Sequence, residues 1–246
     1  MKKFRLLSLN VRIWTKSLDP RKWEQWWLPR TIKMRRLFRK GPKDLNPEET
    51  WIKPDIICLQ ERIYPLGKLL LGLWGYKACG SRKSRLPVYL RRKTFRGYEI
   101  HVKQYCGTVK ENGHGHTFIT FINKSNRKYF SIQNSHFSFN EEDVKREIQN
   151  SFYGSTIFCG DFNLTKDKFM KVFRKVYSYT DLVFFDKEPK GAPTYRSFEK
   201  PDTSYSDIDQ FGYVKFDDSE FSASGHCTIF PDRLSDHYPI LVEIEI

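Results

Sequence analysis

The sequence predicts an α+β fold in which strands outnumber helices. Apolar runs of strand length recur along the whole 246-residue chain, and only three stretches place apolar residues at helical spacing. Hydrophobic residues make up 39% of the chain, which is enough for a sizeable core. Two packed sheets flanked by helices would accommodate this pattern, although periodicity alone leaves other α+β arrangements open.

Most of the predicted strands end at a polar residue. They cover residues 4–10, 55–61, 116–122, 128–135, 156–159, 208–214 and 240–246. The segments 116–122 and 128–135 flank the turn-forming sequence Asn-Lys-Ser-Asn, so we expect them to form a hairpin.

Helices are predicted in three places. The segment 23–39 is interrupted by Pro29, which is tolerated in a first turn, so this helix is expected to begin there. The segment 141–152 has an acidic first turn, as helix N-termini favour. The segment 166–176 carries Phe169, Val172 and Phe173 at helical spacing.

The chain shows no internal repeat and no low-complexity linker, which predicts one domain over residues 1–246. The N-terminus starts with basic residues, but its apolar stretch is short, is interrupted by Arg5 and Asn10 and has no small-residue cleavage site, so it is predicted to be a strand and not a signal peptide. No apolar run approaches the ~18 residues that cross a bilayer. The five cysteines have no CxxC spacing, and Cys58 and Cys159 are expected to be buried thiols. We therefore expect a soluble intracellular protein, cytoplasmic or nuclear.

The formal net charge of +14 favours a polyanionic partner. Nucleic acid is the obvious candidate, because neutralising its phosphates releases counterions. General solubility is the alternative explanation for the charge.

Six short motifs place amide, carboxylate or imidazole groups at strand ends, where a rigid scaffold presents reactive groups. In chain order they are SLN (8–10), CLQE (58–61), NSH (134–136), GDFN (160–163), IDQF (208–211) and SDHYP (235–239).

Glu61 ends an apolar strand, and Asn10 ends another. Magnesium requires hard oxygen ligands, so the Glu61 carboxylate with the Asn10 amide oxygen suits a magnesium site. Taken singly, each residue also fits a structural role as a strand-end acid or a turn-forming asparagine.

The GDFN motif combines three features. Gly160 can take the positive φ of a tight strand exit. Asp161 and Asn163 are two residues apart, so in extended chain they project to the same side and could orient a water and contact a phosphate. The alternative is an Asx-type turn that opens the following helix.

Histidines supply the proton chemistry. His237 could take a proton from water, with Asp209 behind it to fix its tautomer. His136 could protonate a leaving oxygen or stabilise charge on phosphate. Either histidine could instead be a structural, hydrogen-bonded residue. His114 and His116, in a glycine-rich hairpin without nearby acids, are predicted to be a loop and not a metal site.

The ordered set of motifs resembles the endonuclease/exonuclease/phosphatase superfamily, the deoxyribonuclease I-like metal-dependent phosphodiesterases, over residues 10–239. The resemblance implies a four-layer α/β/β/α sandwich with two mostly antiparallel sheets. It also implies hydrolysis of a phosphate ester by metal-activated water. By this resemblance Asn10, Glu61 and Asp236 are metal ligands for Mg²⁺, for which Mn²⁺ could substitute.

The same resemblance implies the catalytic roles. His237 corresponds to the general base and Asp209 to the carboxylate that orients it. Asp161 and Asn163 correspond to the pair that positions nucleophile and phosphate, and His136 to the histidine that contacts the scissile phosphate.

The sequence departs from the family pattern in two places. About 50 residues separate Asn10 from Glu61, which is long for a connection in a compact domain. The segment 80–109 lacks the family's glycine-rich apolar strand, and its part 82–96 holds seven Lys or Arg and no acid. Aromatic residues are interleaved with these bases, which suits a nucleic acid strand. Arg91, Arg92 and Arg96 are therefore predicted to bind substrate, the alternative being a solvated loop whose aromatics turn to the core.

The function that the sequence favours is thus a nuclease or a nucleic-acid end-processing phosphodiesterase. One alternative is a phospholipid or phosphoinositide phosphohydrolase, with Trp23, Trp26 and Trp27 at an anionic membrane. The other is a catalytically inactive nucleic-acid-binding module, although every expected catalytic position holds a competent residue.

Overall fold

A computed structural model describes most of the chain. The described residues are 3–11, 34, 36–41, 53–61, 72, 74–80, 86–106, 114–152, 154–178, 180–196, 205–216, 222–230 and 235–246. The tryptophans at 23, 26 and 27 and the predicted helix start at Pro29 lie outside this part.

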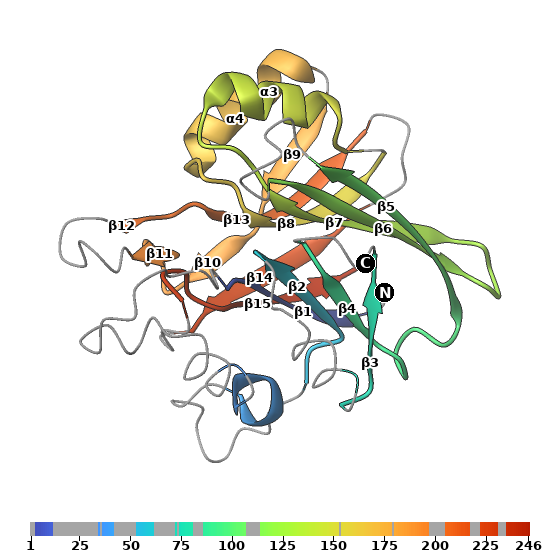
Figure 1. The fold of residues 1–246 in the computed structure, drawn as a ribbon. Coiled ribbons are helices and arrows are strands. Elements are labelled where there is room, and N and C mark those ends of the chain that lie inside the picture. The colour runs from blue at the N-terminus through green and yellow to red at the C-terminus, as the bar shows by residue number, and fades with distance from the viewer. Residues whose placement is uncertain are drawn as a thin grey trace.

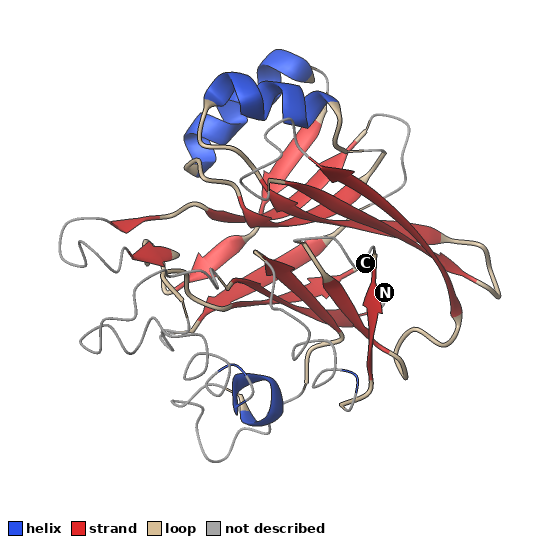
Figure 2. Ribbon diagram, in the orientation of Figure 1, coloured by secondary structure: helices blue, strands red, loops and turns tan. Residues whose placement is uncertain are grey.

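Two β-sheets face each other, and helices cover the outside (Figures 1 and 2). The first sheet has seven strands in the order β10 (Asp186–Glu188), β14 (Ser224–Ile229), β15 (Ile240–Glu245), β1 (Lys3–Asn10), β2 (Ile56–Gln60), β4 (Val88–Arg91), β3 (Tyr76–Cys79). The second has six, in the order β5 (Tyr98–Cys106), β6 (Gly115–Asn123), β7 (Tyr129–His136), β8 (Thr156–Asp161), β13 (Asp209–Lys215), β9 (Asp181–Phe184). A short pair, β11 (Tyr195–Arg196) and β12 (Tyr205–Ser206), stands apart.

Most neighbouring strands are antiparallel, and the parallel pairs are β1–β2, β10–β14 and β7–β8. The helices α3 (Glu141–Gln149) and α4 (Lys166–Val176) lie over the outer face of the second sheet. Helical residues 36–40 pack against the outer face of the first sheet through Leu37 and Phe38. The architecture is therefore the α/β sandwich of two mostly antiparallel sheets that the sequence predicts.

Three apolar clusters account for the layers. The central cluster joins alternate residues of both sheets, for example Leu6, Cys58, Ile132 and Cys159. The other side of each strand packs outward, so β8 contributes Phe158 to the cluster beneath α3 and α4. This alternation follows from the pleat of a strand, which turns successive side chains to opposite faces.

Strand direction brings the six motifs to one edge. β1 and β2 run parallel and end side by side, with Asn10 opposite Gln60, and antiparallel β15 begins beside the end of β1. In the second sheet β7 and β8 run parallel, so His136 lies opposite Asp161. Antiparallel β13 begins there with Asp209, which is also opposite Asp161.

Most predicted elements are confirmed with small shifts in their bounds. The hairpin forms as β6 and β7, and α4 spans the predicted 166–176. α3 ends at Gln149, three residues before the predicted 152. Several strands were not predicted, including β4 within the basic part 82–96, β5 directly after it and β14 before the final motif.

Cys58, Cys79, Cys159 and Cys227 are free and buried, as expected for Cys58 and Cys159. Among the described helices, none has the length and apolar character required to cross a membrane.

Candidate active site

Asp161 is the hub of a buried polar cluster at the shared edge of the two sheets. Its Oδ2 accepts a hydrogen bond from Asn10 Nδ2 at 2.8 Å, across the interface between the sheets. The same oxygen lies 3.5 Å from Nε2 of His136 and 3.5 Å from Nε2 of His237. All four residues are at most 4% exposed. Four motifs that are distant in sequence therefore meet at one carboxylate oxygen.

His237 and Asp209 form a second, tight contact. His237 Nδ1 lies 2.9 Å from Asp209 Oδ2, so Nε2 is left facing Asp161. Burial opposes protonation of His237, but the charges of Asp209, Asp161 and Asp236, together with the Asp209 hydrogen bond, raise its pKa to about 10. The imidazole is thus held in one orientation by a carboxylate, as in hydrolase triads.

Glu61 stands beside this hub at the end of β2. It has a φ of 55°, a left-handed conformation that is uncommon for glutamate and is found where surrounding structure imposes it. Its Oε1 lies 3.4 Å from Asn10 Nδ2. Burial and the negative charge of Asp236 raise the pKa of Glu61.

This donor set fits a divalent cation. The negative charges of Glu61 and Asp236 repel each other in a site with little access to water, and a bound cation would offset this repulsion. Carboxylate and amide oxygens are the hard ligands that Mg²⁺ prefers. Within the described part of the chain, Asp161, Asp209 and His237 also offer ligand atoms that all lie within 4.8 Å of one another. In this second group Asp209 is already engaged by the His237 ring.

Gly160 and Asn163 shape the GDFN motif. Gly160 has a φ of 134°, and a Cβ there would lie 2.0 Å from the backbone oxygen of Ser135 on β7. Asp161 Oδ1 accepts from the backbone N–H of Asn163 at 2.9 Å, so the same carboxylate forms both the Asx turn and the hub. The chain turns at Asn163, whose φ is 51°, and its Nδ2 donates to the backbone oxygen of Phe137. The extended-chain argument for a shared side of Asp161 and Asn163 is therefore wrong, because the chain is not extended there.

Two sets of supporting residues were missed from the sequence. Thr194 Oγ1 accepts a hydrogen bond from the backbone N–H of Asp209. Tyr195 pairs with His237 in an isolated antiparallel β-bridge, and the centroids of their two rings lie 5.1 Å apart. No periodicity or motif marks this segment. Gln60 Nε2 donates to Asn134 Oδ1 at 2.6 Å, which ties the two sheets together at the same edge. Gln60 stands inside the CLQE motif and Asn134 inside the NSH motif, so their place next to predicted site residues was the signal that could have identified them.

Arg91, Arg92 and Arg96 lie away from this cluster. The backbone N–H of Arg91 donates to Asp55, which precedes β2, whereas Glu61 follows β2. Asp55 and Glu61 are six residues apart along this strand, and extended chain of that length spans about 20 Å. The prediction that these arginines flank the site is wrong, because β4 runs antiparallel to β2 and leaves the site edge before it reaches them.

The aromatic residues of that basic segment are also not a stacking surface. Tyr89 and Phe95 are buried, and Tyr98 is partly buried and packs against the central cluster. The alternative in which the aromatics turn to the core is therefore correct. The bases at 82–85 lie outside the described residues.

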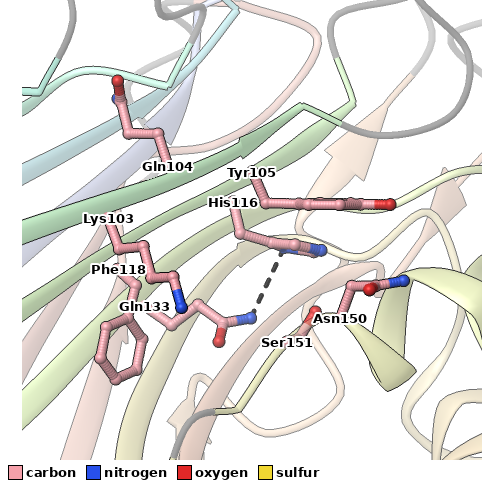
Figure 3. Close-up of a pocket in the computed structure, with 8 residues that line it drawn as sticks. All are labelled: Lys103, Gln104, Tyr105, His116, Phe118, Gln133, Asn150 and Ser151. Carbon is pink, nitrogen blue, oxygen red and sulfur yellow. Dashed lines mark hydrogen bonds between the residues drawn. The ribbon is translucent and has the colours of Figure 1, made fainter.

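His114 and His116 make contacts other than with the candidate cation ligands, and His116 lies on strand β6 and not in the predicted loop. His114 Nδ1 contacts the backbone oxygen of Phe137 at 2.8 Å, and its ring lies 4.6 Å from that of His136. His116 lines a pocket of about 110 Å³ on the helix-covered side of the second sheet, where Tyr105 stacks over it (Figure 3). That pocket contains none of the predicted site residues.

No protein-family model and no curated protein sequence matches this chain. Solved structures do. The endonuclease/exonuclease/phosphatase from Bacteroides vulgatus is 18% identical with a TM-score of 0.69, over 100% of both chains. The mannosyl-6-phosphatase of Bacteroides thetaiotaomicron is 17% identical with a TM-score of 0.68, over 99% of this chain and 100% of that one. D. rerio TDP2, complexed with a single-strand DNA product, is 15% identical with a TM-score of 0.63, over 100% of both chains.

The protein therefore has the fold of the endonuclease/exonuclease/phosphatase proteins over its full length. The family resemblance carried by the six motifs is confirmed at the level of the fold. The structures that share it include a sugar phosphatase and a protein with a DNA product, so the fold does not select a substrate.

Proposed function

We propose that this chain is a metal-dependent phosphodiesterase that hydrolyses nucleic acid, with one catalytic domain over residues 1–246. One observation carries the proposal. The Asp209–His237 pair directs His237 Nε2 at Asp161, and Asn10 connects Asp161 to Glu61, so a base, an orienting acid and cation ligands share one site.

Asn10, Glu61 and Asp236 would hold Mg²⁺, or Mn²⁺ in its place. When bound, the cation polarises a phosphoryl oxygen and offsets negative charge. With a cation offsetting the carboxylate charges that raise its pKa to about 10, neutral His237 would accept a proton from the attacking water at Nε2, while Asp209 keeps its Nδ1 side engaged. Asp161 orients that water. His136 Nε2 and the Asn163 amide contact the phosphate, on which charge builds during attack.

Nucleic acid is the proposed substrate because the chain combines this site with a net charge of +14, which concentrates polyanions. The TDP2 structure with its single-strand DNA product supports this choice by similarity of fold. The mannosyl-6-phosphatase favours a second candidate, a phosphatase acting on a small phosphorylated sugar.

A substrate panel tests the proposal. Labelled single- and double-stranded DNA and RNA are incubated beside mannose 6-phosphate, a phosphoinositide and sphingomyelin, with Mg²⁺ or with EDTA. We expect cation-dependent cleavage of nucleic acid. Turnover of only the sugar phosphate or a lipid would contradict the proposal that nucleic acid is the substrate. Binding of nucleic acid without any turnover would indicate a catalytically inactive binding module.

Variants test the site. We expect His237→Ala and Asp161→Ala each to lower turnover by about 100-fold or more, since a positioned acid or base contributes ~10²–10⁴-fold. His101→Ala is the matched control, because His101 is exposed and pairs with Glu99. Circular dichroism reports folding. Unchanged rates in a folded His237 or Asp161 variant would refute the site.

A further inference from the structure

Phe139 is an exposed aromatic side chain at the edge of the candidate active site. It follows β7 by three residues, after His136, and precedes α3. Its side chain is 72% exposed, the highest value among the large apolar residues of the described segments. The neighbouring Phe137 is fully buried in the cluster beneath α3 and α4. Packing therefore explains Phe137, whereas most of the Phe139 ring is left in solvent.

Ring contacts connect Phe139 to the hub. Its ring centroid lies 5.8 Å from that of His114, in an edge-to-face arrangement of 83°. The His114 ring lies 4.6 Å from the His136 ring, whose Nε2 faces Asp161. His114 Nδ1 is fixed by the Phe137 backbone oxygen, which also accepts from the Asn163 amide. Phe139 is thus two ring contacts away from the place where a phosphate would sit.

Charge near Phe139 limits what can bind there. The first turn of α3 begins two residues later with Glu141, Glu142 and Asp143. Three carboxylates disfavour a phosphate group or an anionic membrane at this position. An uncharged aromatic ring has no such penalty, and it gains by stacking on an exposed phenyl face.

We propose that Phe139 is a stacking platform for the nucleobase next to the scissile phosphate, so that the substrate is single-stranded nucleic acid. The inference rests on the proposed function. A base in a duplex is already stacked on its neighbours, whereas an unpaired base offers its face to Phe139 while its phosphate reaches His136.

Two variants and two substrates test the platform. Phe139→Leu keeps an apolar side chain and removes the ring, and Phe139→Trp keeps a stacking face. The matched control is Tyr129→Leu, since Tyr129 is 67% exposed but stands at the opposite end of β7. Each protein is assayed on single-stranded DNA and RNA oligonucleotides, and on the same strands made abasic at the nucleotides flanking the cleaved bond.

We expect Phe139→Leu to raise KM on the base-containing strands by roughly 5- to 150-fold, because stacking of a base contributes ~1–3 kcal/mol. Phe139→Trp and Tyr129→Leu should leave KM close to that of the original protein. On the abasic strands, the original protein and Phe139→Leu should have the same KM.

The outcomes separate the two proposals. If the original protein hydrolyses the base-containing strands but Phe139→Leu does so with the same KM, the platform is overturned and the proposed function stands. If Phe139→Leu raises KM equally on the base-containing and the abasic strands, the ring has a structural role and the platform is also overturned. If the original protein hydrolyses no strand of either kind, the proposed function fails and the platform with it.

Discussion

At the residue scale, Gly160 sets the distance between the strands that present His136 and Asp161. Its φ is 134°, and only 2.0 Å separates Ser135 O from the position that a Cβ would occupy, which leaves no room for a side chain. We expect Gly160→Ala to lower the free energy of unfolding by ~3 kcal/mol or more, because both the backbone and the β7–β8 pairing must distort. Urea denaturation measures this. Gly97→Ala is the control, since nothing lies within 4 Å of its added Cβ, and a comparable loss there would contradict the explanation.

His116 is a second residue whose burial has a measurable consequence. Burial and the nearby His136 lower its pKa to about 3 from the ordinary 6.5. Between these values the unfolded chain binds a proton that the folded protein does not, so stability is complete above pH 6.5 and falls as the pH drops toward 3. The slope is about 1.4 kcal/mol per pH unit, or about 2 kcal/mol between pH 6.5 and 5. We expect His116→Gln to remove this part of the acid dependence in urea titrations. An acid dependence unchanged by His116→Gln would contradict the assignment.

At the scale of elements, Lys187 connects the two sheets beside the site. It belongs to β10 of the first sheet, and its Nζ donates to Asp207 Oδ1, to the backbone oxygen of Asp209 and to Gln210 Oε1 at the start of β13. Its side chain is 12% exposed. We expect Lys187→Met to lower the free energy of unfolding by ~2–4 kcal/mol, since buried acceptors lose a charged donor, and to slow turnover by displacing Asp209. Lys3→Met should change neither, because the Lys3 ion pair is 79% exposed at the lysine. Equal effects of the two substitutions would show that Lys187 does not position β13.

The elements also show which parts of the fold the sequence could predict. β2 and β8 were recognisable because both of their faces are buried, which gives them the continuous apolar stretches IICL and IFC. β4 was hidden, since basic residues surround its short apolar stretch, Val88–Leu90. Without β4, the direction of the chain through the basic segment could not be known. The arginines that follow were therefore assigned to the wrong end of the sheet.

At the scale of the whole molecule, the convergence of the six motifs was predictable and its detailed contacts were not. The family resemblance of the ordered motifs implies a common site, and β1, β2, β7 and β8 do end at one edge. The turn at Asn163 and the bridge between Tyr195 and His237 depend on tertiary packing that no local pattern records. Sequence patterns thus identified which groups belong together, whereas their partners became visible only in the folded structure.

The net charge of +14 contrasts with the carboxylates gathered at the site, so long-range attraction and local chemistry come from different parts of the molecule. If a nucleic acid strand is held by several phosphates, its apparent affinity falls with salt as each contact gives up counterions. Three contacts to a single strand predict a loss of about 20-fold between roughly 50 and 200 mM salt, and one contact about 3-fold. We expect kcat/KM to follow the first figure for a long single-stranded oligonucleotide and the second for a dinucleotide with one phosphodiester, at constant Mg²⁺. An equal salt dependence for the two substrates would mean that only the scissile phosphate is bound, which would favour a small phosphate ester as the substrate.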